Sequence, residues 1–465
     1  MIARSNFQDG TCPRLRHPTS PGRRVLRPGT YARKITSKNA AAQIWFDRGL
    51  VWCYAFNHVE GYRCFEQAIS HDPQCAMAYW GLAYATGLNY NKGWRFFDPM
   101  DLKHTMKVCH DASWHAPRLI EIEAMQVRYP MDHPVADFAQ INHSYDQAMR
   151  KVHEEFPKDL DVMTLYVDSK MHITQRKMFD SKTGLPIEMS PVFDVQHLFQ
   201  EGLRHLNANT NSGVLHFCIH FWEMSATPAV ALPPADHLRT LVPGAGHLHH
   251  MPTHLDVLVG DYRGGIESNT AAVAADEKYL ARYGAKNMYS VYRLHNYHSL
   301  IYSAMLSDQS KIALATPDQM EASITTDVLL TKSPPLADWL EFFLSVRVRV
   351  YVRFGLWGAL NALLTPEEQG ITHAARGNLP EAYRYRELYK AAAANVPASR
   401  RDHPNCVVDI LKVATAMLNG EIEYRAGNYD VAFRCPWPTR DSQTSKMLNE
   451  IWTFQQNLLN NTGQH

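Results

Sequence analysis

The sequence predicts an all-α protein built from helical hairpins that repeat along the chain and curve around a central groove. Two observations favour this fold class. Apolar and small residues recur at helical spacing through most of the 465 residues, whereas alternating β-branched runs are few. A 34-residue pattern near the N-terminus is also echoed at several later places. A chain of this length suits either two domains or one extended repeat array.

Residues 42–75 carry the signature of a tetratricopeptide (TPR) repeat, a unit of two packed helices, A and B. Counted from Ala42, the seven signature positions 4, 8, 11, 20, 24, 27 and 32 hold Trp45, Gly49, Trp52, Gly61, Phe65, Ala68 and Pro73. Small residues let the two helices approach closely, and proline ends helix B. Weaker echoes start at residues 76, 260, 377 and 426. The chain is therefore predicted to be a TPR-like solenoid of degenerate repeats.

Four segments are predicted along the chain. Residues 1–38 carry nine Lys or Arg and one acidic residue, and four prolines prevent the amphipathic helix of a transit peptide. We expect a disordered basic tail there. A Pro/Gly loop at 180–191 separates N-terminal repeats, 39–180, from histidine-rich repeats, 192–330. Residues 331–465 hold the last helical repeats, interrupted by a Pro- and charge-rich break at 396–405.

Composition narrows the class of protein. The chain has 47 Lys and Arg against 46 Asp and Glu, which argues against a dedicated binder of nucleic acid or anionic membrane. No apolar run approaches the length of about 18 residues that a membrane span requires. The eight cysteines form no C-x-x-C pair and predict reduced, packed thiols in a cytoplasmic protein. Histidine is unusually frequent, with 24 residues.

Two His-x3-His pairs stand one repeat apart. His216 and His220 precede His250 and His254 by 34 residues, so both pairs fall at positions 5 and 9 of helix A, in repeats that start at Ser212 and Gly246. Helix A lines the concave side of a TPR hairpin, where positions 2, 5, 9 and 12 face the groove, and residues four apart share a helix face. A third helix, predicted at 287–306, carries His295 and His298. Three consecutive A helices are thus expected to present imidazoles to one cavity.

Imidazoles at this spacing predict a transition-metal site. Several imidazoles, one carboxylate and no thiolate suit Fe, Cu or Zn rather than Ca or Fe–S clusters, and we favour Fe or Cu. The sequence leaves open a mononuclear site of two histidines and a carboxylate, and a dinuclear copper or iron centre. Glu223, at position 12, serves either as a catalytic group or to orient an imidazole. Alternatively, the imidazoles bind a peptide, a polar ligand or each other.

Three further residues are candidates for the same cavity. His58 opens helix B of the first repeat, where it either packs and caps the helix or lines the cavity. Trp80 and Tyr84 stand at positions 5 and 9 of the second repeat and form either apolar walls of the groove or helix–helix contacts. His247 and His249 fall off the predicted face and are expected to support the ligands or to lie on the surface.

Four segments resemble, in the same order, a family of TPR-domain proteins from fungi and bacteria: AFNHVEGYRCFEQAISHDPQCAMAYWGLA, LHFCIHFWEMS, LVPGAGHLHHMPTHLDVLVGDYRGGIESNTAAVAAD and LHNYH. The resemblance covers about residues 40–310. It implies an all-α TPR-like solenoid and places the family's histidine motifs on His216, His220, His250, His254, His295 and His298. Members in biosynthetic gene clusters imply tailoring chemistry.

The leading hypothesis is a metal-dependent oxidoreductase that acts on a small organic substrate, with open coordination positions for dioxygen or substrate. One alternative is a scaffold whose groove binds a partner protein or peptide. Another is a zinc-type hydrolase or lyase with Glu223 as general base. Peptide-carboxylate clamps require Lys, Arg or Asn at positions 5 and 9, and histidine at these positions favours the metal hypothesis.

Overall fold

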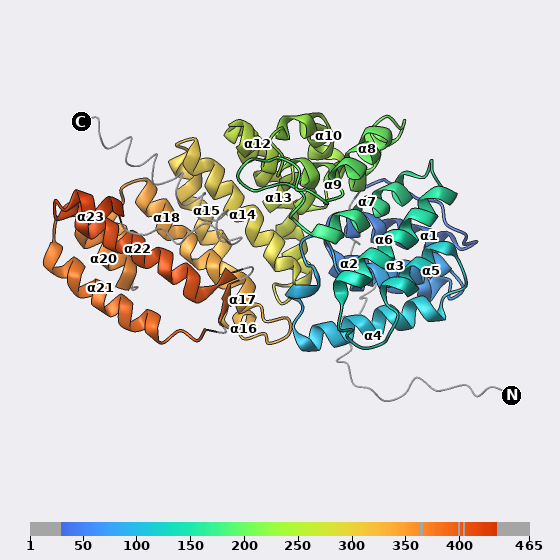
Figure 1. Ribbon diagram of the computed structural model, residues 1–465, viewed down its shortest axis with the longest axis horizontal. Coiled ribbons are helices and arrows are strands. Elements are labelled where there is room, and N and C mark those ends of the chain that lie inside the picture. The colour runs from blue at the N-terminus through green and yellow to red at the C-terminus, as the bar shows by residue number, and fades with distance from the viewer. Residues whose placement is uncertain (1–28, 363–365, 399, 403–404, 435–465) are drawn as a thin grey trace.

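The computed structural model confirms an all-α array of helical hairpins (Figure 1). It describes residues 29–362, 366–398, 400–402 and 405–434. Helices that follow one another in the chain pack side by side, and the chain runs from the N-terminal helices at one end, through the histidine-rich helices in the middle, to the C-terminal helices at the other end.

The N-terminal part contains α1 (Ala40–Tyr54), α2 (His58–His71), α3 (Ala76–Thr86), η1 (Trp94–Phe96), α4 (Pro99–His115), α5 (Ile120–Arg128), α6 (Phe138–Glu155) and α7 (Leu160–Thr174). The central part contains α8 (Val192–Gly202), η2 (Ala208–Thr210), α9 (Ser212–Trp222), η3 (Pro228–Ala231), α10 (Leu232–Leu241), α11 (Gly246–His250), α12 (Thr253–Val259), α13 (Tyr262–Tyr283) and α14 (Tyr289–Leu306).

The C-terminal part contains α15 (Ser310–Ala322), α16 (Thr326–Leu329), α17 (Ala337–Leu340), η4 (Glu341–Ser345), α18 (Val346–Arg353), α19 (Trp357–Asn361), α20 (Pro366–Ala375), α21 (Leu379–Ala394), α22 (Val407–Arg425) and α23 (Tyr429–Arg434). Within the break predicted at 396–405, two-residue strands β1 (Arg401–Asp402) and β2 (Asn405–Cys406) pair antiparallel.

The first hairpin packs as the TPR signature predicts. The Phe65 ring of α2 fills the space beside Gly49 of α1 and Gly81 of α3, where a β-carbon would lie 2.8 Å and 2.2 Å from ring atoms. Phe65 is fully buried, so a side chain at either glycine would displace it. The three helices therefore lock together through one aromatic ring.

Proline separates helices at two places in the chain. Helices α4 and α5 are separate because Pro117 holds the preceding Ala116 in an extended conformation, with ψ 148°. The A helix that starts at Gly246 divides into α11 and α12 because Pro252 has no N–H to continue the hydrogen-bond ladder. The predicted starts of the two histidine repeats, Ser212 and Gly246, are both helix starts.

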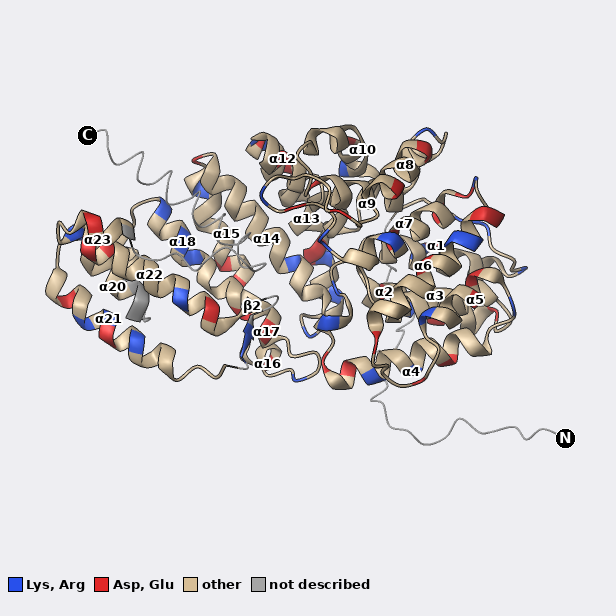
Figure 2. Cartoon of the chain, in the orientation of Figure 1, with Lys and Arg blue, Asp and Glu red and all other residues tan. Residues whose placement is uncertain are grey.

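The buried apolar side chains form three groups. The first runs from Ile35 to Leu255, the second from Leu294 to Val350 and the third from Ala374 to Ile422. Helices α9, α11 and α12 belong to the first group and α14 to the second, so the histidine-rich helices stand where two cores meet. Basic and acidic residues are interspersed along the helices, as the balanced composition predicts (Figure 2).

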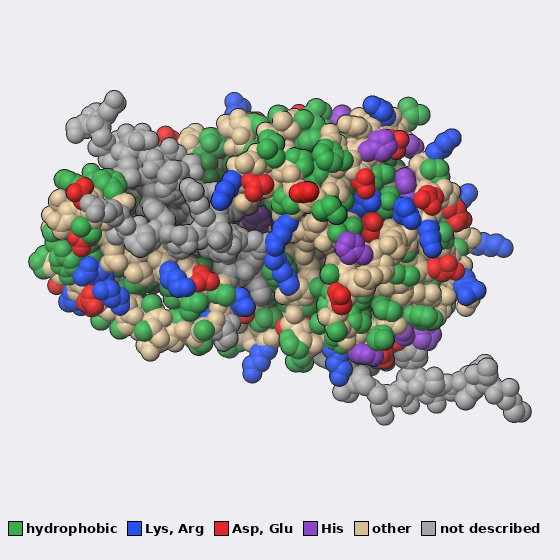
Figure 3. Space-filling model, viewed as in Figure 1, with side chains coloured by type: hydrophobic (Ala, Val, Ile, Leu, Met, Phe, Trp, Pro, Cys, Tyr) green, Lys and Arg blue, Asp and Glu red, His purple; other side chains and the backbone are tan. Residues whose placement is uncertain are grey.

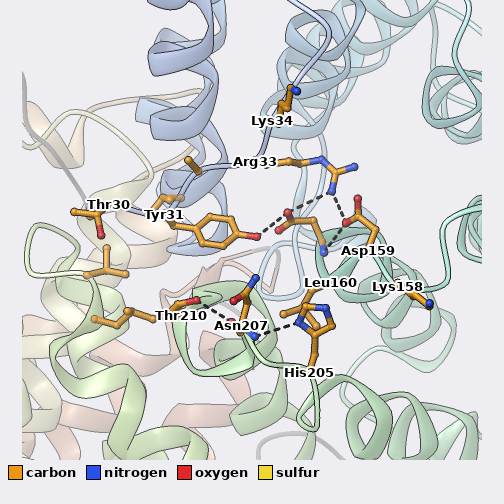
Figure 4. A pocket seen from close by; sticks show the side chains of 16 residues that line it. Thr30, Tyr31, Arg33, Lys34, Lys158, Asp159, Leu160, His205, Asn207 and Thr210 are labelled. Carbon is orange, nitrogen blue, oxygen red and sulfur yellow. Dashed lines mark hydrogen bonds and ion pairs between the residues drawn. The ribbon is translucent and has the colours of Figure 1, made fainter.

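The described part of the predicted tail, residues 29–38, packs against the helices, because Ile35 is buried and neighbouring side chains are bonded. Tyr31 donates a 2.8 Å hydrogen bond to Asp161, and Arg33 pairs with Asp159. These residues line a pocket of ≈ 570 Å³ in which opposite charges neutralise each other (Figure 4). The rest of the predicted tail lies outside the described residues.

Two other sequence expectations concern the cysteines and the membrane. Cys53, Cys64, Cys75, Cys109 and Cys218 are free and buried, as predicted for packed thiols. Over the described ranges, the helices are too short or too polar to span a bilayer.

Candidate metal centre

Six imidazoles from α9, α11, α12 and α14 form two groups of three. We call His216, His220 and His247 the closed triad, and His250, His254 and His295 the open triad. Within each triad, one nitrogen from every ring lies within 4.8 Å of the other two. Neighbouring ring centroids are 4.7 Å apart for His216 and His220, and 4.6 Å apart for His250 and His295.

The two triads adjoin each other through Glu223. The rings of His220 and His254 are 5.9 Å apart. Glu223, at the C-cap of α9, has Oε1 2.9 Å from Nδ1 of His220 and Oε2 2.6 Å from Nδ1 of His254. One buried carboxylate therefore orients one ring of each triad, which is the role that carboxylates commonly play behind metal-binding histidines.

Local sequence explains how α9 holds its two histidines. Asn211 caps the helix by accepting a hydrogen bond from the Val214 N–H and donates from Nδ2 to Asp161 on α7. Every residue from Ser212 to Phe221 is buried, so the helix is enclosed on all sides. A polar ring in such a helix is retained only where it has a partner.

The Nδ1 atoms are held by acceptors. Nδ1 of His216 lies 2.6 Å from the Tyr54 carbonyl, and Nδ1 of His220 faces Glu223. Each of these Nδ1 atoms must therefore carry the ring hydrogen, and in a neutral ring Nε2 then has a free lone pair. Nε2 of His216, Nε2 of His220 and both ring nitrogens of His247 have no hydrogen-bond partner among the described residues. Leaving such groups unpaired costs about 1–3 kcal/mol each.

In the open triad, acceptors also hold the Nδ1 atoms of His250 and His254, and the Nε2 atoms point at each other. Nε2 of His250 and Nε2 of His254 face each other at 3.0 Å. Nδ1 of His250 donates to Oδ1 of Asn269, whose amide orientation is fixed because Nδ2 donates to Thr253 and to the Gly265 carbonyl. Nδ1 of His254 donates to Glu223. Two neutral rings would then direct lone pairs at each other, so a proton or a metal cation must lie between them.

Burial lowers the pKa of five of the six imidazoles. It lowers the pKa of His216, His247 and His250 well below the usual value. It also lowers the pKa of His220 to about 4 and of His295 to about 3. Burial alone would raise the pKa of Glu223, but His254 and His220 lower it well below its usual value. These five low pKa values favour the neutral form of the rings near neutral pH, which is the form that binds metal, beside an ionised carboxylate.

Two strained residues touch the centre. Phe56 and Arg176 have φ of 53° and 60°, a region that costs non-glycine residues about 1–2 kcal/mol. The Phe56 ring stacks on His220 at 5.6 Å and on His247 at 5.4 Å. Tyr292 completes the aromatic wall, 4.9 Å from the ring of His247.

Some of the predicted site residues lie in the two triads, and others lie outside them. It brings five of the six predicted ligands into the triads but leaves out His298, whose ring contacts Phe342 at 5.6 Å and Phe343 at 6.1 Å. His58 lies behind Phe56, with Nδ1 3.1 Å from the Ala85 carbonyl. Trp80 and Tyr84 stack on each other at 5.2 Å, and Tyr84 lies 5.7 Å from His58.

His247 is the ligand candidate that the sequence interpretation missed. The expectation that it falls off the groove face is wrong, because its ring is buried in the closed triad. It occupies position 2 of its repeat, which faces the groove, and stands three residues before His250, so the repeat frame held the signal. His249 points elsewhere, with Nδ1 2.6 Å from the Arg239 carbonyl.

Comparisons with known proteins add little about the centre. No protein-family model and no curated protein sequence matches the chain. Among solved structures, a human IFIT1 dimer with m7Gppp-AAAA is 13% identical, with 86% of this chain and 90% of that chain covered at a TM-score of 0.34. The IFIT1 dimer with PPP-AAAA is 12% identical, with coverage of 77% and 92% and a TM-score of 0.27. The Cut9 and Hcn1 hetero-tetramer of APC/C is 11% identical, with coverage of 86% and 77% and a TM-score of 0.22.

Proposed function

We propose that the protein is a metal-dependent oxidoreductase with a dinuclear centre, in which each triad binds one transition-metal ion. The facing Nε2 atoms of His250 and His254, 3.0 Å apart, carry the proposal. Two imidazole nitrogens at this separation can both lie about 2.0–2.1 Å from one ion. The unpartnered Nε2 atoms of His216 and His220 offer the same donors in the closed triad.

The donor set favours iron or copper, with zinc as the alternative. Each triad supplies three neutral nitrogens and no thiolate, which suits Cu, Fe or Zn and leaves coordination positions open. Two redox-active ions bound side by side would supply two-electron chemistry with dioxygen. In the proposed reaction, a small organic substrate loses two electrons and two protons, and dioxygen takes them up.

The placement of Glu223 supports redox chemistry over hydrolysis. A hydrolase of zinc type needs a carboxylate that faces the attacking water. Both oxygens of Glu223 are instead engaged by His220 and His254, and the side chain is buried. The protein groups thus orient imidazoles, while Phe56 and Tyr292 limit the access of water to the closed triad.

Metal analysis of tag-free protein by inductively coupled plasma mass spectrometry tests the proposal. We expect about two ions per chain in the wild type. The double variants His216→Ala/His220→Ala and His250→Ala/His254→Ala should each lose about one ion. A matched control, His133→Ala/His197→Ala, removes two histidines whose side chains are 63% and 68% exposed and should keep both ions.

Other outcomes decide against parts of the proposal. A protein that holds no metal and takes up none from added Fe, Cu or Zn salts is not a metalloenzyme. A single ion that both double variants lose contradicts the dinuclear arrangement. Zinc with no spectral change on anaerobic reduction and re-oxidation would support the hydrolase or lyase alternative.

A further inference from the structure

Arg176 lies beside Glu223, the carboxylate that the two triads share. The side chain of His254 is 24% exposed and that of Arg176 is 32% exposed, and both lie against the buried Glu223. Arg176 Nη1 is 3.7 Å from Oε1 of Glu223, and its guanidinium lies over the ring of Tyr90 at 5.1 Å. Figure 3 shows histidine atoms in a hollow near the centre of the molecule, with basic side chains nearby.

Arg176 is held in place at an energetic cost. Its backbone is in the left-handed region, with φ 60°, directly after the end of α7. Its Nη2 also donates to Asn91. Strain of about 1–3 kcal/mol is retained where the surrounding structure fixes a residue, commonly at a functional site. The strained conformation and the stacking on Tyr90 fix the direction of the guanidinium relative to the centre.

Two other arginines lie in this part of the molecule, Arg95 near Arg176 and Arg349 near His298. Burial, followed by the charge of Arg176, lowers the pKa of Arg95. Arg349 lies close enough to contribute to the low pKa of His298, after burial. Glu223 is the acidic group that faces Arg176, and it is shared with two imidazoles. Metal ions in the triads would add further positive charge, which would favour an anion beside Arg176.

We infer that Arg176 is the anchor for the carboxylate of a small organic acid substrate, which it orients toward the two triads. The reaction of the bound substrate rests on the proposed function. Its binding does not, because Arg176 is part of the chain and is present with or without metal. Arginine recognises carboxylates with paired N–H donors, and the Tyr90 ring under the guanidinium holds it beside the centre. Arg176 acts here as a binding residue.

Calorimetric titration with benzoate and with its neutral isostere benzamide tests the inference. We expect the wild type to bind benzoate at least about tenfold more tightly than benzamide. Arg176→Gln should make the two affinities about equal while the metal content, which reports an intact centre, stays unchanged. Arg176→Lys should retain part of the preference. Arg263→Gln, which removes an equal charge from a side chain that is 89% exposed on α13, should behave as the wild type.

The same titration on chelator-treated protein separates this inference from the proposed function. A preference for benzoate that survives metal removal and depends on Arg176 supports the anchor even if the protein proves not to be an oxidoreductase. A preference that disappears with the metal, or that Arg176→Gln leaves intact, overturns the inference because the carboxylate is then recognised by other groups. Failure of the wild type to bind benzoate also overturns it.

Discussion

The two triads use the same donors but differ in their surroundings. In the closed triad, the three rings are at most 1% exposed, and Phe56 lies against all three. In the open triad, His250 is equally buried, but the His254 side chain is 24% exposed and His295 is partly exposed. If each triad binds an ion as proposed, the closed triad would keep its ion from solvent, whereas the open triad is the one that a substrate could reach.

The supports of the triads differ as well. The closed triad is held from the first core, through the Tyr54 carbonyl and the buried helix α9. The open triad is held by Asn269 of α13 and by α14, whose buried side chains belong to the second core. Among the described residues, Glu223 orients one ring of each triad, His220 and His254. Variants can therefore address each triad separately or both together.

Phe56→Ala should have the largest effect, and it should act on the closed triad. Phe56 is 2% exposed, and removing a buried phenylalanine costs about 3–5 kcal/mol of unfolding free energy. Because φ at this position is 53°, Phe56→Gly should recover about 1 kcal/mol of that loss. Urea unfolding of both variants checks this. Equal stability of the two would show that the backbone of Phe56 stores no strain.

Glu223→Gln should weaken metal binding in the two triads unequally. A glutamine has one acceptor oxygen, so its NH₂ group must face an imidazole N–H of either His220 or His254. Losing such an orienting partner typically reduces metal affinity about 10–100-fold. Competition with a chromophoric chelator measures the two affinities. If both ions remain as tightly bound as in the wild type, the carboxylate does not couple the triads.

The sequence predicted much of this arrangement and missed identifiable parts of it. The 34-residue frame located the starts of α9 and α11 and paired His216 and His220 with His250 and His254, because these depend on local helical periodicity. The contact of Glu223 with α12 depends on how separate repeats stack. The positive φ of Phe56 depends on tertiary packing, which no pattern of residue types encodes.

Asp276 should make the stability of the protein depend on pH through its bonds to α14, the helix that carries His295. It accepts hydrogen bonds from Tyr289 and Asn296 of α14, and burial raises its pKa to about 7. Between pH 4 and 7 the folded protein thus holds a proton that the unfolded chain has released, so this group makes stability fall as pH rises, by up to about 1.4 kcal/mol per pH unit. Asp276→Asn should remove that slope from the pH dependence of the unfolding free energy. An unchanged slope would show that Asp276 ionises normally.

His298→Ala should have the smallest effect on metal binding and provides the sharpest check of which ring belongs to the open triad. His295 and His298 lie on the same helix, and their ring centroids are 6.5 Å apart, but only His295 has a nitrogen within 4.8 Å of those of His250 and His254. Packing against Phe342 and Phe343 turns His298 away, and that packing comes from η4, a segment in which the sequence held no recognised motif. His295→Ala should therefore lower the metal affinity of the open triad, whereas His298→Ala should change it less than about threefold, a difference below 1 kcal/mol. The reverse order would place His298 in the coordination sphere and would require α14 to rotate when metal binds.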